Sequence, residues 1–561
     1  MTTNNTFTFT RVISDAVSNY ASNKAIGFID EPSLTYAQLG EQINAAMAML
    51  EKLDINPGDR VVIFSQNMPN WVIVYFALQK MGAVAVPVLP DFSAFELQNV
   101  LQHSEAKCIF ISESLEYKLA DIKSEFLDTQ VRIDNFSIIS GKLSGIVFDK
   151  NEAPQKSYEP GENELAILLY TSGTTGESKG VMLSQKNVIF NAIQSGNVQS
   201  INEKDKFLSV LPLSHTYENT IGLILPILHG ASITYLRKPP TASVLVPAMQ
   251  KLKPTFMLTV PMIIEKVYRN SILPQIQAKI ATKILHKFKP TRKLIYLLAG
   301  KKLYQTFGGN LKFFGIGGAK LDGVVEQFLR DAKFPYAIGY GLTETSPLLA
   351  GSNPTQTKYQ AIGPKVTDCE VIINNPDPHT GEGEIWAKGA NVMLGYYKNE
   401  AKTREIMTDD GWLKTGDLGV YDKQGWLSHK GRLKNMIVGA NGENIYPEEI
   451  ESVINNFRHV IESVVIEQKG KLVAMVHFNR EELEQKFKTV TSDIAQRVDT
   501  KIDEISHKVD DAIAELSAEL HQYVNSRVNK YSRIQMLVVH PDPFQKTATK
   551  KIKRYLYFKQ T

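Results

Sequence analysis

The first 165 residues alternate between two sequence periodicities, and this alternation constrains the fold more than any other feature of the chain. LTYAQLGEQINAAMAMLEKL (34–53) has apolar residues three and four apart, as in an amphipathic helix, whereas RVVIF (60–64) and KCIFIS (107–112) are short apolar runs typical of buried strands. NWVIVYFALQKMGAVAVPV (70–88) predicts a helix, a glycine stop and another strand. Strands that alternate with helices form parallel sheets covered by helices, so we predict an α/β fold here.

The pattern changes twice further along the chain. The α/β alternation continues to about residue 365, after which the short runs CEVIINN, GEIWAKG and GWLSHKG indicate a smaller β-rich subdomain. After Gly431 the composition changes again. We therefore predict a large N-terminal domain over residues 1–430, made of two doubly wound α/β subdomains and the β-rich one, and a small α+β C-terminal domain over residues 431–561.

A long helical pattern occupies much of this C-terminal domain. From Phe487 to Val528 apolar residues recur mostly in steps of three, four and four, which is an 11-residue helical repeat. No Gly or Pro lies between Gly470 and Pro541, so residues 481–530 form one long amphipathic helix or two stacked ones. Two arrangements stay open: the apolar face covers the domain's own sheet, or it projects and pairs with a partner or a second copy, as in a homodimer.

Composition excludes several classes of protein. The two cysteines, Cys108 and Cys369, are too few for a disulfide framework or a Cys-rich metal site, which favours a reducing compartment. The N-terminal sequence MTTNNTFTFTRV has neither the basic nor the apolar region of a signal peptide, and no run of 18 apolar residues occurs. We therefore expect a cytoplasmic protein without a transmembrane helix, and the charge distribution leaves open a peripheral contact at the inner face of the membrane.

Positive charge is concentrated in one segment. The chain has a net charge of +4, yet residues 266–321 hold ten Lys and two Arg and no Asp or Glu, so this segment is +12 and the rest carries −8. Within residues 266–312 basic and apolar residues are mixed at near-helical spacing. This pattern is typical either of a solvated basic helix face or of contact with an anionic membrane. Nucleic-acid binding is the least favoured interpretation, because no nucleic-acid motif accompanies the charge.

The stretch YTSGTTGESKGVML (170–183) combines glycines, hydroxyl groups and a lysine directly after an apolar run. A Walker A loop requires G-x-x-x-x-G-K-[ST], but from Gly173 the chain reads GTTGESKG, so the lysine is displaced and no Ser or Thr follows it. Glycine still lets the backbone approach an anion closely, and hydroxyls and a lysine add donors. We predict a phosphate-binding loop outside the P-loop class, whose candidate groups are Thr171, Ser172, Gly173, Thr174, Thr175, Gly176 and Lys179.

TSGTTG-x-x-KG resembles the signature loop of the adenylate-forming superfamily, which includes acyl-CoA synthetases, luciferases and the adenylation domains of peptide synthetases. Seven further motifs follow in the family's order: LPLSHTYENT (211–220), GGAKLD (317–322), YGLTETSP (340–347), GEIWAKGANVMLGYY (383–397), WLKTGD (412–417), GRLKNMIVGANGENIYPEEIE (431–451) and KTATKKIKR (546–554). The resemblance covers residues 165–555. One such motif would be weak evidence, whereas eight in order are specific.

The resemblance implies a binding site for ATP, and the residues fit its adenine. Gly317, Gly318 and Ala319 offer bare backbone on which a flat base can lie. Tyr340, which Gly341 follows, can stack on the other face of that base.

The resemblance also implies residues for Mg²⁺, the ribose and the acyl group. Glu344 is the implied Mg²⁺ ligand, because a carboxylate among hydroxyls such as that of Thr343 faces ATP phosphates only with a cation between them. Asp417 can accept hydrogen bonds from both ribose hydroxyls, and Arg432 contacts the same ribose in the family. His215 occupies a position that borders the acyl pocket and the nucleotide.

The closing lysine motif implies the chemistry. In the family a substrate carboxylate attacks the α-phosphate of ATP and expels pyrophosphate, and a mobile lysine stabilises the developing charge. Lys551 occupies that position, with Lys550 as the fallback because it stands where the family usually has Gly. A mobile C-terminal domain then turns about a hinge in the motif G-R-x-[DK], where this chain has Lys434, so that coenzyme A can attack the acyl-adenylate.

Overall the resemblance is closest to long-chain fatty acyl-CoA synthetases, which implies a fatty acid and coenzyme A as substrates. Amino-acid-activating enzymes place an Asp near the substrate amine, but LSHTYENTIG has none. Only LGVYDKQGWLSHK separates Asp417 from Gly431, whereas ligases that load a carrier protein often carry an insertion there. Two alternatives stay open: an acyl-adenylate ligase serving an acyl-carrier protein, and a non-catalytic lipid-binding protein on the same fold.

Overall fold

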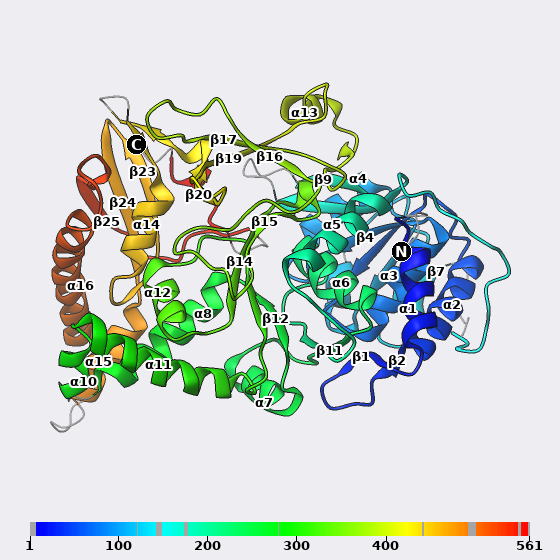
Figure 1. Ribbon diagram of the computed structural model, residues 1–561, viewed down its shortest axis with the longest axis horizontal. Helices are drawn as coiled ribbons and strands as arrows, with labels where there is room; N and C mark the ends of the chain where they lie inside the picture. The colour runs from blue at the N-terminus through cyan, green and yellow to red at the C-terminus, as the bar shows by residue number, and fades with distance from the viewer. Residues whose placement is uncertain are drawn as a thin grey trace.

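The computed structural model describes residues 7–120, 122–141, 148–172, 178–278, 280–439, 443–491, 501–547 and 551–558. Within these ranges the strands form two eight-stranded sheets, a four-stranded sheet, a three-stranded sheet and a two-stranded ribbon (Figure 1). Among the helices so described, none combines the length and the apolar character that crossing a bilayer requires. The mixed α/β architecture predicted from the sequence is confirmed.

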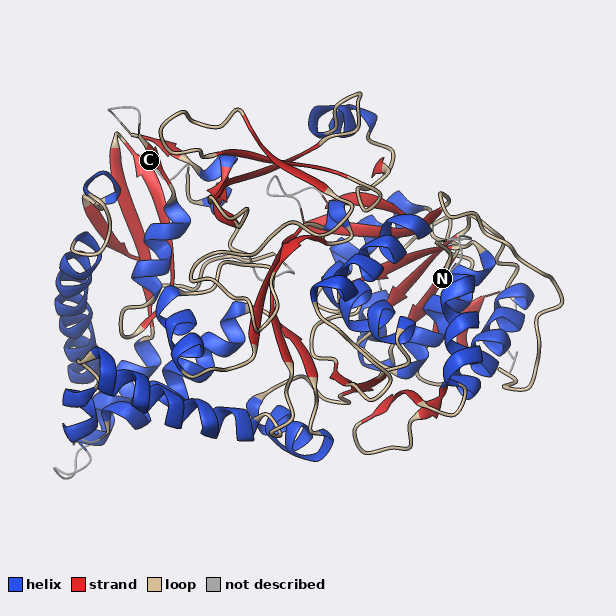
Figure 2. Ribbon diagram, in the orientation of Figure 1, coloured by secondary structure: helices blue, strands red, loops and turns tan. Residues whose placement is uncertain are grey.

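The first large sheet contains the predicted parallel strands, in the order β18-β9-β8-β4-β3-β5-β6-β7. These are β3 (Arg60–Phe64), β4 (Val84–Val88), β5 (Cys108–Ile111), β6 (Thr129–Arg132), β7 (Ser137–Gly141), β8 (Leu165–Ser172), β9 (Ser178–Ser184) and β18 (Gly395–Tyr396). Val61 and Ile63 face the core beneath α2 (Tyr36–Lys52) and α3 (Pro69–Met81), while Val62 and Phe64 face α4 (Ala94–Ser104). Because helices cover both faces (Figure 2), the central strands β3, β4 and β5 are apolar and buried along almost their whole length rather than alternating.

Local sequence signals set the ends of these helices. α2 begins at a capping box in which Thr35 and Gln38 satisfy each other's backbone N–H groups, and Ser93 and Glu96 do the same for α4. α3 ends at Gly82, whose φ of 72° lies in the left-handed region that favours glycine. The glycine stop predicted in residues 70–88 is therefore confirmed.

The second large sheet takes up the first two strands of the chain, which the alternation alone does not predict. Its order is β15-β14-β13-β12-β10-β11-β1-β2, with β1 (Lys24–Phe28), β2 (Leu34–Thr35), β10 (Lys206–Leu208), β11 (Ser232–Tyr235), β12 (Phe256–Thr259), β13 (Phe313–Ile316), β14 (Tyr336–Gly341) and β15 (Leu348–Gly351). β1 runs parallel to β11, with Ile26 opposite Ile233. α1 (Phe9–Tyr20), α2 and α3 share one core with residues of both sheets, so this helical layer joins them.

The helices between β9 and β15 carry several of the sequence motifs. They are α5 (Gln185–Val198), the π-helix η2 (Tyr217–Ile224), α6 (Leu225–Leu228), α7 (Ala242–Leu252), α8 (Pro261–Val267), the π-helix η3 (Tyr268–Ile272), α9 (Leu273–Gln277), α10 (Ile280–Leu285), α11 (Lys289–Thr306), α12 (Gly323–Asp331) and the short 3₁₀ turn η4 (Thr343–Thr345). Within residues 266–312 the described elements are the end of α8, then η3, α9, α10 and α11. The inner face of α11 is buried through Tyr296, Gly300 and Leu303.

The predicted β-rich region is an antiparallel sheet in the order β16-β17-β19-β20. Its strands are β16 (Glu370–Asn374), β17 (Gly383–Lys388), β19 (Leu413–Tyr421) and β20 (Leu427–Arg432), and α13 (Glu400–Ile406) lies in the connection before β19. β20 runs two residues past the expected domain end at residue 430 and leads into the 3₁₀ turn η5 (Leu433–Asn435).

The last part of the chain packs helices on its own small sheet. The elements are β21 (Ile437–Val438), β22 (Asn444–Ile445), α14 (Pro447–Asn455), β23 (Val460–Gln468), β24 (Lys471–Phe478), α15 (Arg480–Thr491), α16 (Lys501–Asn525) and β25 (Met536–Val539). Val509, Leu516 and Leu520 of α16 share a core with Val465 of β23 and Ile450 of α14 (Figure 1). Among the described residues the pattern forms α15 and α16, and the apolar face of α16 covers the sheet of this part of the chain, in line with the first of the two expected arrangements.

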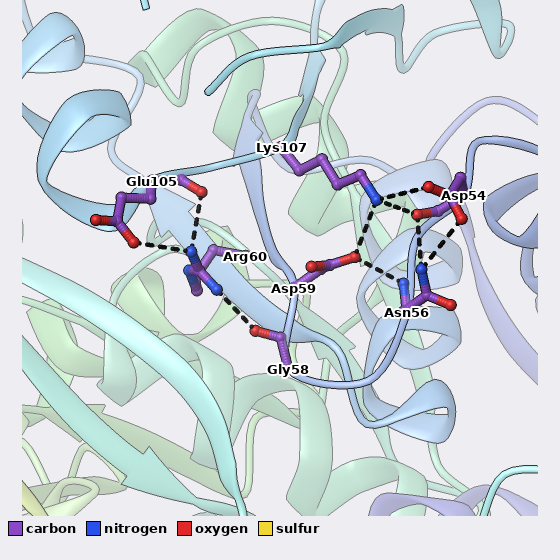
Figure 3. A network of polar contacts seen from close by, with 7 residues as sticks. All are labelled: Asp54, Asn56, Gly58, Asp59, Arg60, Glu105 and Lys107. Carbon is purple, nitrogen blue, oxygen red and sulfur yellow. Dashed lines mark hydrogen bonds and ion pairs between the residues drawn. The ribbon is translucent and has the colours of Figure 1, made fainter. Parts of the chain in front are cut away.

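A polar network stabilises the amino-terminal ends of β3 and β5 (Figure 3). Lys107 donates to the Asp54 carboxylate at 3.0 Å and to Asp59 at 3.4 Å, while Arg60 donates to the Ser104 carbonyl at 2.7 Å and to the Glu105 carboxylate at 3.2 Å. In parallel sheets ligands bind beyond the opposite, carboxyl ends of the strands. This network is therefore structural, and the candidate site lies elsewhere.

Candidate active site

The phosphate-binding loop predicted from the sequence connects two antiparallel strands. Thr171 at the end of β8 pairs with Lys179 at the start of β9. Gly173, Thr174, Thr175 and Gly176 lie outside the described residues, and the backbone of Ser172 completes β8. The strands on either side of the loop pair antiparallel, whereas a P-loop lies between a strand and a helix.

Lys179 and Glu344 come together across the ring of Tyr396. The Lys179 ammonium lies 5.1 Å from the ring centroid of Tyr396, whose hydroxyl donates to Glu344 Oε1 at 2.9 Å. Burial, with the charges of Lys402 and Lys434, lowers the pKa of Lys179, while Glu344 counteracts the shift. The arrangement places a cation and a half-buried carboxylate beside the predicted phosphate loop.

The turn that carries Glu344 is held from several sides. The Met393 N–H donates to the Glu344 carbonyl at 2.9 Å, and the Thr345 hydroxyl donates to the Pro347 carbonyl at 2.6 Å. A Cβ at Gly341 would lie 1.8 Å from that Pro347 carbonyl oxygen, so only glycine fits there. Thr343 immediately precedes Glu344 and is half-buried. The close approach of the Pro347 carbonyl therefore explains why position 341 is a glycine, apart from the nucleotide-binding role predicted for Gly341.

Asp417 is buried among three partners. The Tyr340 hydroxyl donates to its Oδ2 at 2.9 Å, Arg432 Nε lies 2.8 Å from its Oδ1, and His429 Nε2 lies 3.5 Å from the same oxygen. Burial alone would raise the pKa of Asp417, but His429, the Arg432 guanidinium and the Tyr340 hydroxyl hold it below its ordinary value. Asp417 is therefore an anion poised to accept further hydrogen bonds.

The antiparallel pairing of β19 and β20 creates this cluster, with Asp417 directly opposite Arg432. His429, on the same strand as Arg432, is a site residue that the motifs do not indicate. Its ring lies 5.8 Å from that of Tyr340. The only sequence signal is its position in GWLSHKGR, three residues before Arg432 on a strand that must pair with KTGD.

The residues present fit a nucleoside. Oδ1 of Asp417 is buried and has an ion-pair contact but no hydrogen bond of good geometry among the described residues, which suits a ribose hydroxyl. Gly318 adopts a φ of 84°, and an added Cβ there would meet only Val260, at 3.8 Å. Gly318 and Ala319 are exposed, whereas Gly317 packs against the ring of Tyr217. Exposed backbone of this kind can receive a planar base.

His215 is neutral and holds its proton in a defined position. Burial, with the nearby charge of Lys551, lowers the pKa of His215 to about 4. Its Nδ1 accepts a hydrogen bond from the Tyr217 N–H at 3.3 Å, so the proton of the neutral ring is on Nε2. His215 can therefore donate one hydrogen bond from Nε2 to an acidic ligand.

Lys551 reaches the same site from the end of the chain. Its backbone closes a short hairpin, in which the Thr547 N–H donates to the Lys551 carbonyl at 2.8 Å. The residue keeps contact with solvent, yet burial of its ammonium and the charge of Arg432 lower the pKa of Lys551, against the opposing effect of Asp417 and Glu344. Lys550 lies outside the described residues. Lys434 is exposed in η5, and its charge contributes to the lowered pKa of Lys179.

An apolar pocket adjoins the site. Tyr217, Ile221 and Leu225 line it from η2 and α6. The remaining lining comes from α5, the strands β10, β12, β13, β14 and β15, and nearby loops: Ser195, Val198, Gln199, Ile201, Phe207, Phe256, Leu258, Phe313, Gly315, Ala337, Ile338, Gly339, Leu348, Gly351 and Ser352. The ring of Tyr217 also abuts Gly317, so this residue separates the pocket from the exposed glycine backbone.

Comparison with known proteins agrees with this geometry. Residues 14–397 match the family described as AMP-binding enzyme. The long-chain-fatty-acid–CoA ligase FadD15 of Mycobacterium bovis is 30% identical over 489 residues, which cover 80% of this chain and 78% of that protein. The peroxisomal long chain acyl-CoA synthetase 7 of Arabidopsis thaliana is 28% identical over 513 residues, or 83% of this chain and 72% of its own.

Two solved structures share the fold. The o-succinylbenzoate CoA synthetase of Bacillus subtilis, in complex with its acyl-adenylate intermediate, superposes with a TM-score of 0.74 at 23% identity over 98% of each chain. ATP-bound MatB from Rhodopseudomonas palustris superposes with a TM-score of 0.74 at 21% identity, also over 98% of each chain. The family match spans well over half of the sequence, and the chain therefore belongs to the AMP-binding enzymes of the adenylate-forming superfamily.

Proposed function

We propose that the protein is a long-chain fatty acid–CoA ligase that uses ATP and Mg²⁺ to form an acyl-adenylate and then transfers the acyl group to coenzyme A. The observation that carries the proposal is the apolar pocket. Tyr217, which lines it, also abuts Gly317 and donates its backbone N–H to His215, on whose pKa the charge of Lys551 acts. A hydrocarbon chain fits a space lined by aliphatic and aromatic side chains. Its carboxylate then lies at the polar side of Tyr217, next to His215.

In the first half-reaction a carboxylate oxygen of the acid bonds to the α-phosphorus of ATP, and the bond to pyrophosphate breaks. Lys551 stabilises the negative charge that grows on the phosphoryl oxygens, because a cation in a partly desolvated site acts strongly. His215 donates its Nε2 proton as a hydrogen bond to the same charge, and Asp417 accepts from the ribose. No covalent link to the protein is needed.

Glu344 is the residue that would hold Mg²⁺. Tyr396 donates to its Oε1, which leaves Oε2 for a cation, and the described residues contain no group of three or more metal-ligating side chains. This suits Mg²⁺, which keeps water ligands and binds through one or two carboxylates and substrate phosphates. When bound, the metal neutralises charge on those phosphates.

Replacing Glu344 with Gln should raise the Mg²⁺ concentration that gives half-maximal activity about tenfold, because a neutral amide is a weaker ligand. The measurement is an activity titration with Mg²⁺ at saturating ATP. Glu405→Gln is the matched control: Glu405 also acts on the charge of Lys179, but it pairs with Lys402 and is exposed. If the Mg²⁺ titration of Glu344→Gln superimposes on that of the unmodified protein, the assignment of Glu344 as the Mg²⁺ ligand is wrong.

In the second half-reaction the thiol of coenzyme A attacks the acyl carbonyl and AMP leaves. Lys551 occupies the space that the thiol needs, so the chain after Arg432 turns as a mobile domain, with Lys434 in η5 as the hinge. The short connection between Asp417 and Gly431, which is the β19–β20 hairpin, supports coenzyme A over an acyl-carrier protein as acceptor. The intact cluster around Lys551 and Asp417 favours catalysis over a lipid-binding role.

Mass spectrometry of reaction mixtures tests this proposal. Each mixture contains the protein, ATP, Mg²⁺ and fatty acids from short to long, with and without coenzyme A. We expect acyl-CoA only when coenzyme A is present, with long acids consumed first. Acyl-adenylate that accumulates while coenzyme A stays unused would favour the carrier-protein alternative, and no product from any acid would favour lipid binding.

The same proposal includes a peripheral contact with an anionic membrane, from a protein expected in the cytoplasm. The α10–α11 surface carries exposed apolar side chains on Ile280 (80%), Phe288 (60%), Leu294 (60%) and Leu298 (65%). Exposed lysines, Lys283, Lys287, Lys289, Lys293 and Lys301, lie among them. Apolar side chains that enter the headgroup region next to lysines that attract anionic lipids are typical of interfacial helices.

Reversing three of these charges, with Lys283→Glu, Lys287→Glu and Lys293→Glu together, should reduce binding to phosphatidylserine-containing vesicles about tenfold or more, at roughly 1 kcal/mol per basic residue. Co-sedimentation measures the bound fraction. The control with the same charge change is Lys423→Glu, Lys469→Glu and Lys471→Glu, all exposed and elsewhere in the chain. Equal sedimentation of the two triple variants would contradict the membrane contact.

A further inference from the structure

Asn456, the residue that ends α14, joins this helix to the adenine side of the site. Its Oδ1 accepts a hydrogen bond from Arg269 Nη2 at 3.1 Å, and its Nδ2 donates to Asp322 Oδ2. Asp322 is buried and caps α12, where its Oδ1 accepts from the Val324 and Val325 N–H groups at 2.9 and 3.0 Å. One amide side chain thus bridges two elements of the large N-terminal part.

A second contact connects the same two segments. Lys320 Nζ lies 3.3 Å from Glu449 Oε1, one turn into α14. Lys320 and Asp322 belong to GGAKLD and directly follow the glycine backbone that fits the adenine. α14 therefore contacts the carboxyl end of the loop 317–322, which we call the adenine loop. Figure 1 shows α14 next to α12.

The opposite side of α14 holds the hairpin that carries Lys551. Glu451 forms a buried ion pair with Arg554, three residues after Lys551, and its Oε1 accepts from the Val465 N–H at 2.7 Å. The Glu448 carboxylate accepts from Asn435 Nδ2 at 2.6 Å, beside the hinge. α14 is thus a rigid connection between the adenine loop, the hinge and the catalytic lysine.

The contact between α14 and α12 borders an open groove. The groove lies beside Asn456 and is lined by Asp322, Tyr359 and Gln360 on one side and by Tyr523 and Arg527 on the other. The contacts of Asn456 with Asp322 and Arg269 and of Lys320 with Glu449 are polar, and polar interfaces between domains open more readily than apolar ones. Breaking them exposes groups that water can solvate.

We propose that Asn456 is a positioning residue, a latch that holds α14 against Asp322 and so keeps Lys551 in the arrangement for adenylate formation. The inference rests on the proposed two-step function and adds a residue that sets the balance between the steps. Asn456→Ala loses hydrogen bonds to charged groups and should slow acid-dependent ATP–pyrophosphate exchange about tenfold. Thioester formation from supplied acyl-adenylate should be unchanged or faster, since the latch must open for that step.

Two further variants separate the latch from a general effect on structure. Asn456→Asp keeps the shape and the acceptor for Arg269 but cannot donate to Asp322 and adds a like charge, so it should match or exceed the effect of Asn456→Ala. Asn455→Ala is the matched control: the Asn455 side chain accepts from Ser463 Oγ at 2.8 Å within the C-terminal part, and the ratio of the two rates should stay as in the unmodified protein.

Each outcome decides the inference. A fall in exchange with intact thioester formation, for both Asn456 variants and not for Asn455→Ala, supports the latch. An equal loss of both rates, or an Asn456→Asp variant that behaves as the unmodified protein, overturns it. Absence of exchange in the unmodified protein would instead overturn the proposed function, which keeps the two failures apart.

Discussion

Lys551→Ala is expected to slow acyl-adenylate formation by about a hundred- to a thousand-fold, the usual cost of removing one group that stabilises charge in a transition state. The reason is its position: the charges of Arg432, Asp417 and Glu344 act on the pKa of Lys551, although the three residues lie far from it in sequence. Acid-dependent ATP–pyrophosphate exchange measures this step alone. Thioester formation from supplied acyl-adenylate should fall far less, because that step needs the lysine to leave.

Lys553→Ala is the matched control for this variant, since it removes the same charge two residues along the same hairpin. It should leave exchange within about twofold. Lys550→Ala tests the neighbouring lysine in the motif. A loss from Lys551→Ala that is equal in both half-reactions would contradict the assigned role, and a larger loss from Lys550→Ala would transfer that role to Lys550.

Gly351→Leu is expected to shorten the acyl chain that the protein accepts. Gly351 lines the pocket, and a Cβ added there meets the Ile338 carbonyl oxygen at 3.6 Å and Leu348 Cδ1 at 3.7 Å, which are ordinary contacts. The rest of the leucine side chain then fills space that the hydrocarbon tail would occupy. Activity on long acids should fall at least about tenfold, the size of discrimination that one methylene can produce in an apolar pocket.

In this experiment, activity on short acids shows whether Gly351→Leu leaves the catalytic residues intact. Their kcat/KM should stay within about twofold for Gly351→Leu, because the polar side of Tyr217 is unchanged. Gly161→Leu, an exposed glycine-to-leucine change without positive φ, controls for the substitution itself. A uniform loss across all chain lengths, or no loss for long acids, would contradict the assignment of the pocket to the acyl tail.

Local signals in the sequence predict the parallel strands and the motif-bearing turns. RVVIF is apolar throughout because helices cover both faces of β3, and Gly82 ends α3 because only a residue that tolerates positive φ fits there. The order of the motifs also indicates that Asp417 and Arg432 share a function, and the hairpin of β19 and β20 places them opposite each other. These features depend on neighbours close in sequence.

Strand pairings and side-chain contacts between residues distant in the sequence cannot be predicted from local sequence patterns. β1 could pair with either large sheet, and its choice of β11 follows from packing of α1 and α2 between the sheets. His429 and Asn456 are single polar residues whose partners, Asp417 and Asp322, come from other elements. The lining of the acyl pocket is likewise drawn from six or more segments of ordinary apolar residues, so no periodicity identifies it.

If one site joins a nucleotide, an acyl chain and Lys551, as we propose, the protein must catalyse acid-dependent ATP–pyrophosphate exchange. The unmodified protein is incubated with ATP, Mg²⁺ and labelled pyrophosphate, without coenzyme A, and one fatty acid of each length in turn. We expect label to enter ATP only when an acid is present, and fastest with long acids. Exchange that needs no acid, or its absence with every acid while fatty acid still binds, would contradict the proposal.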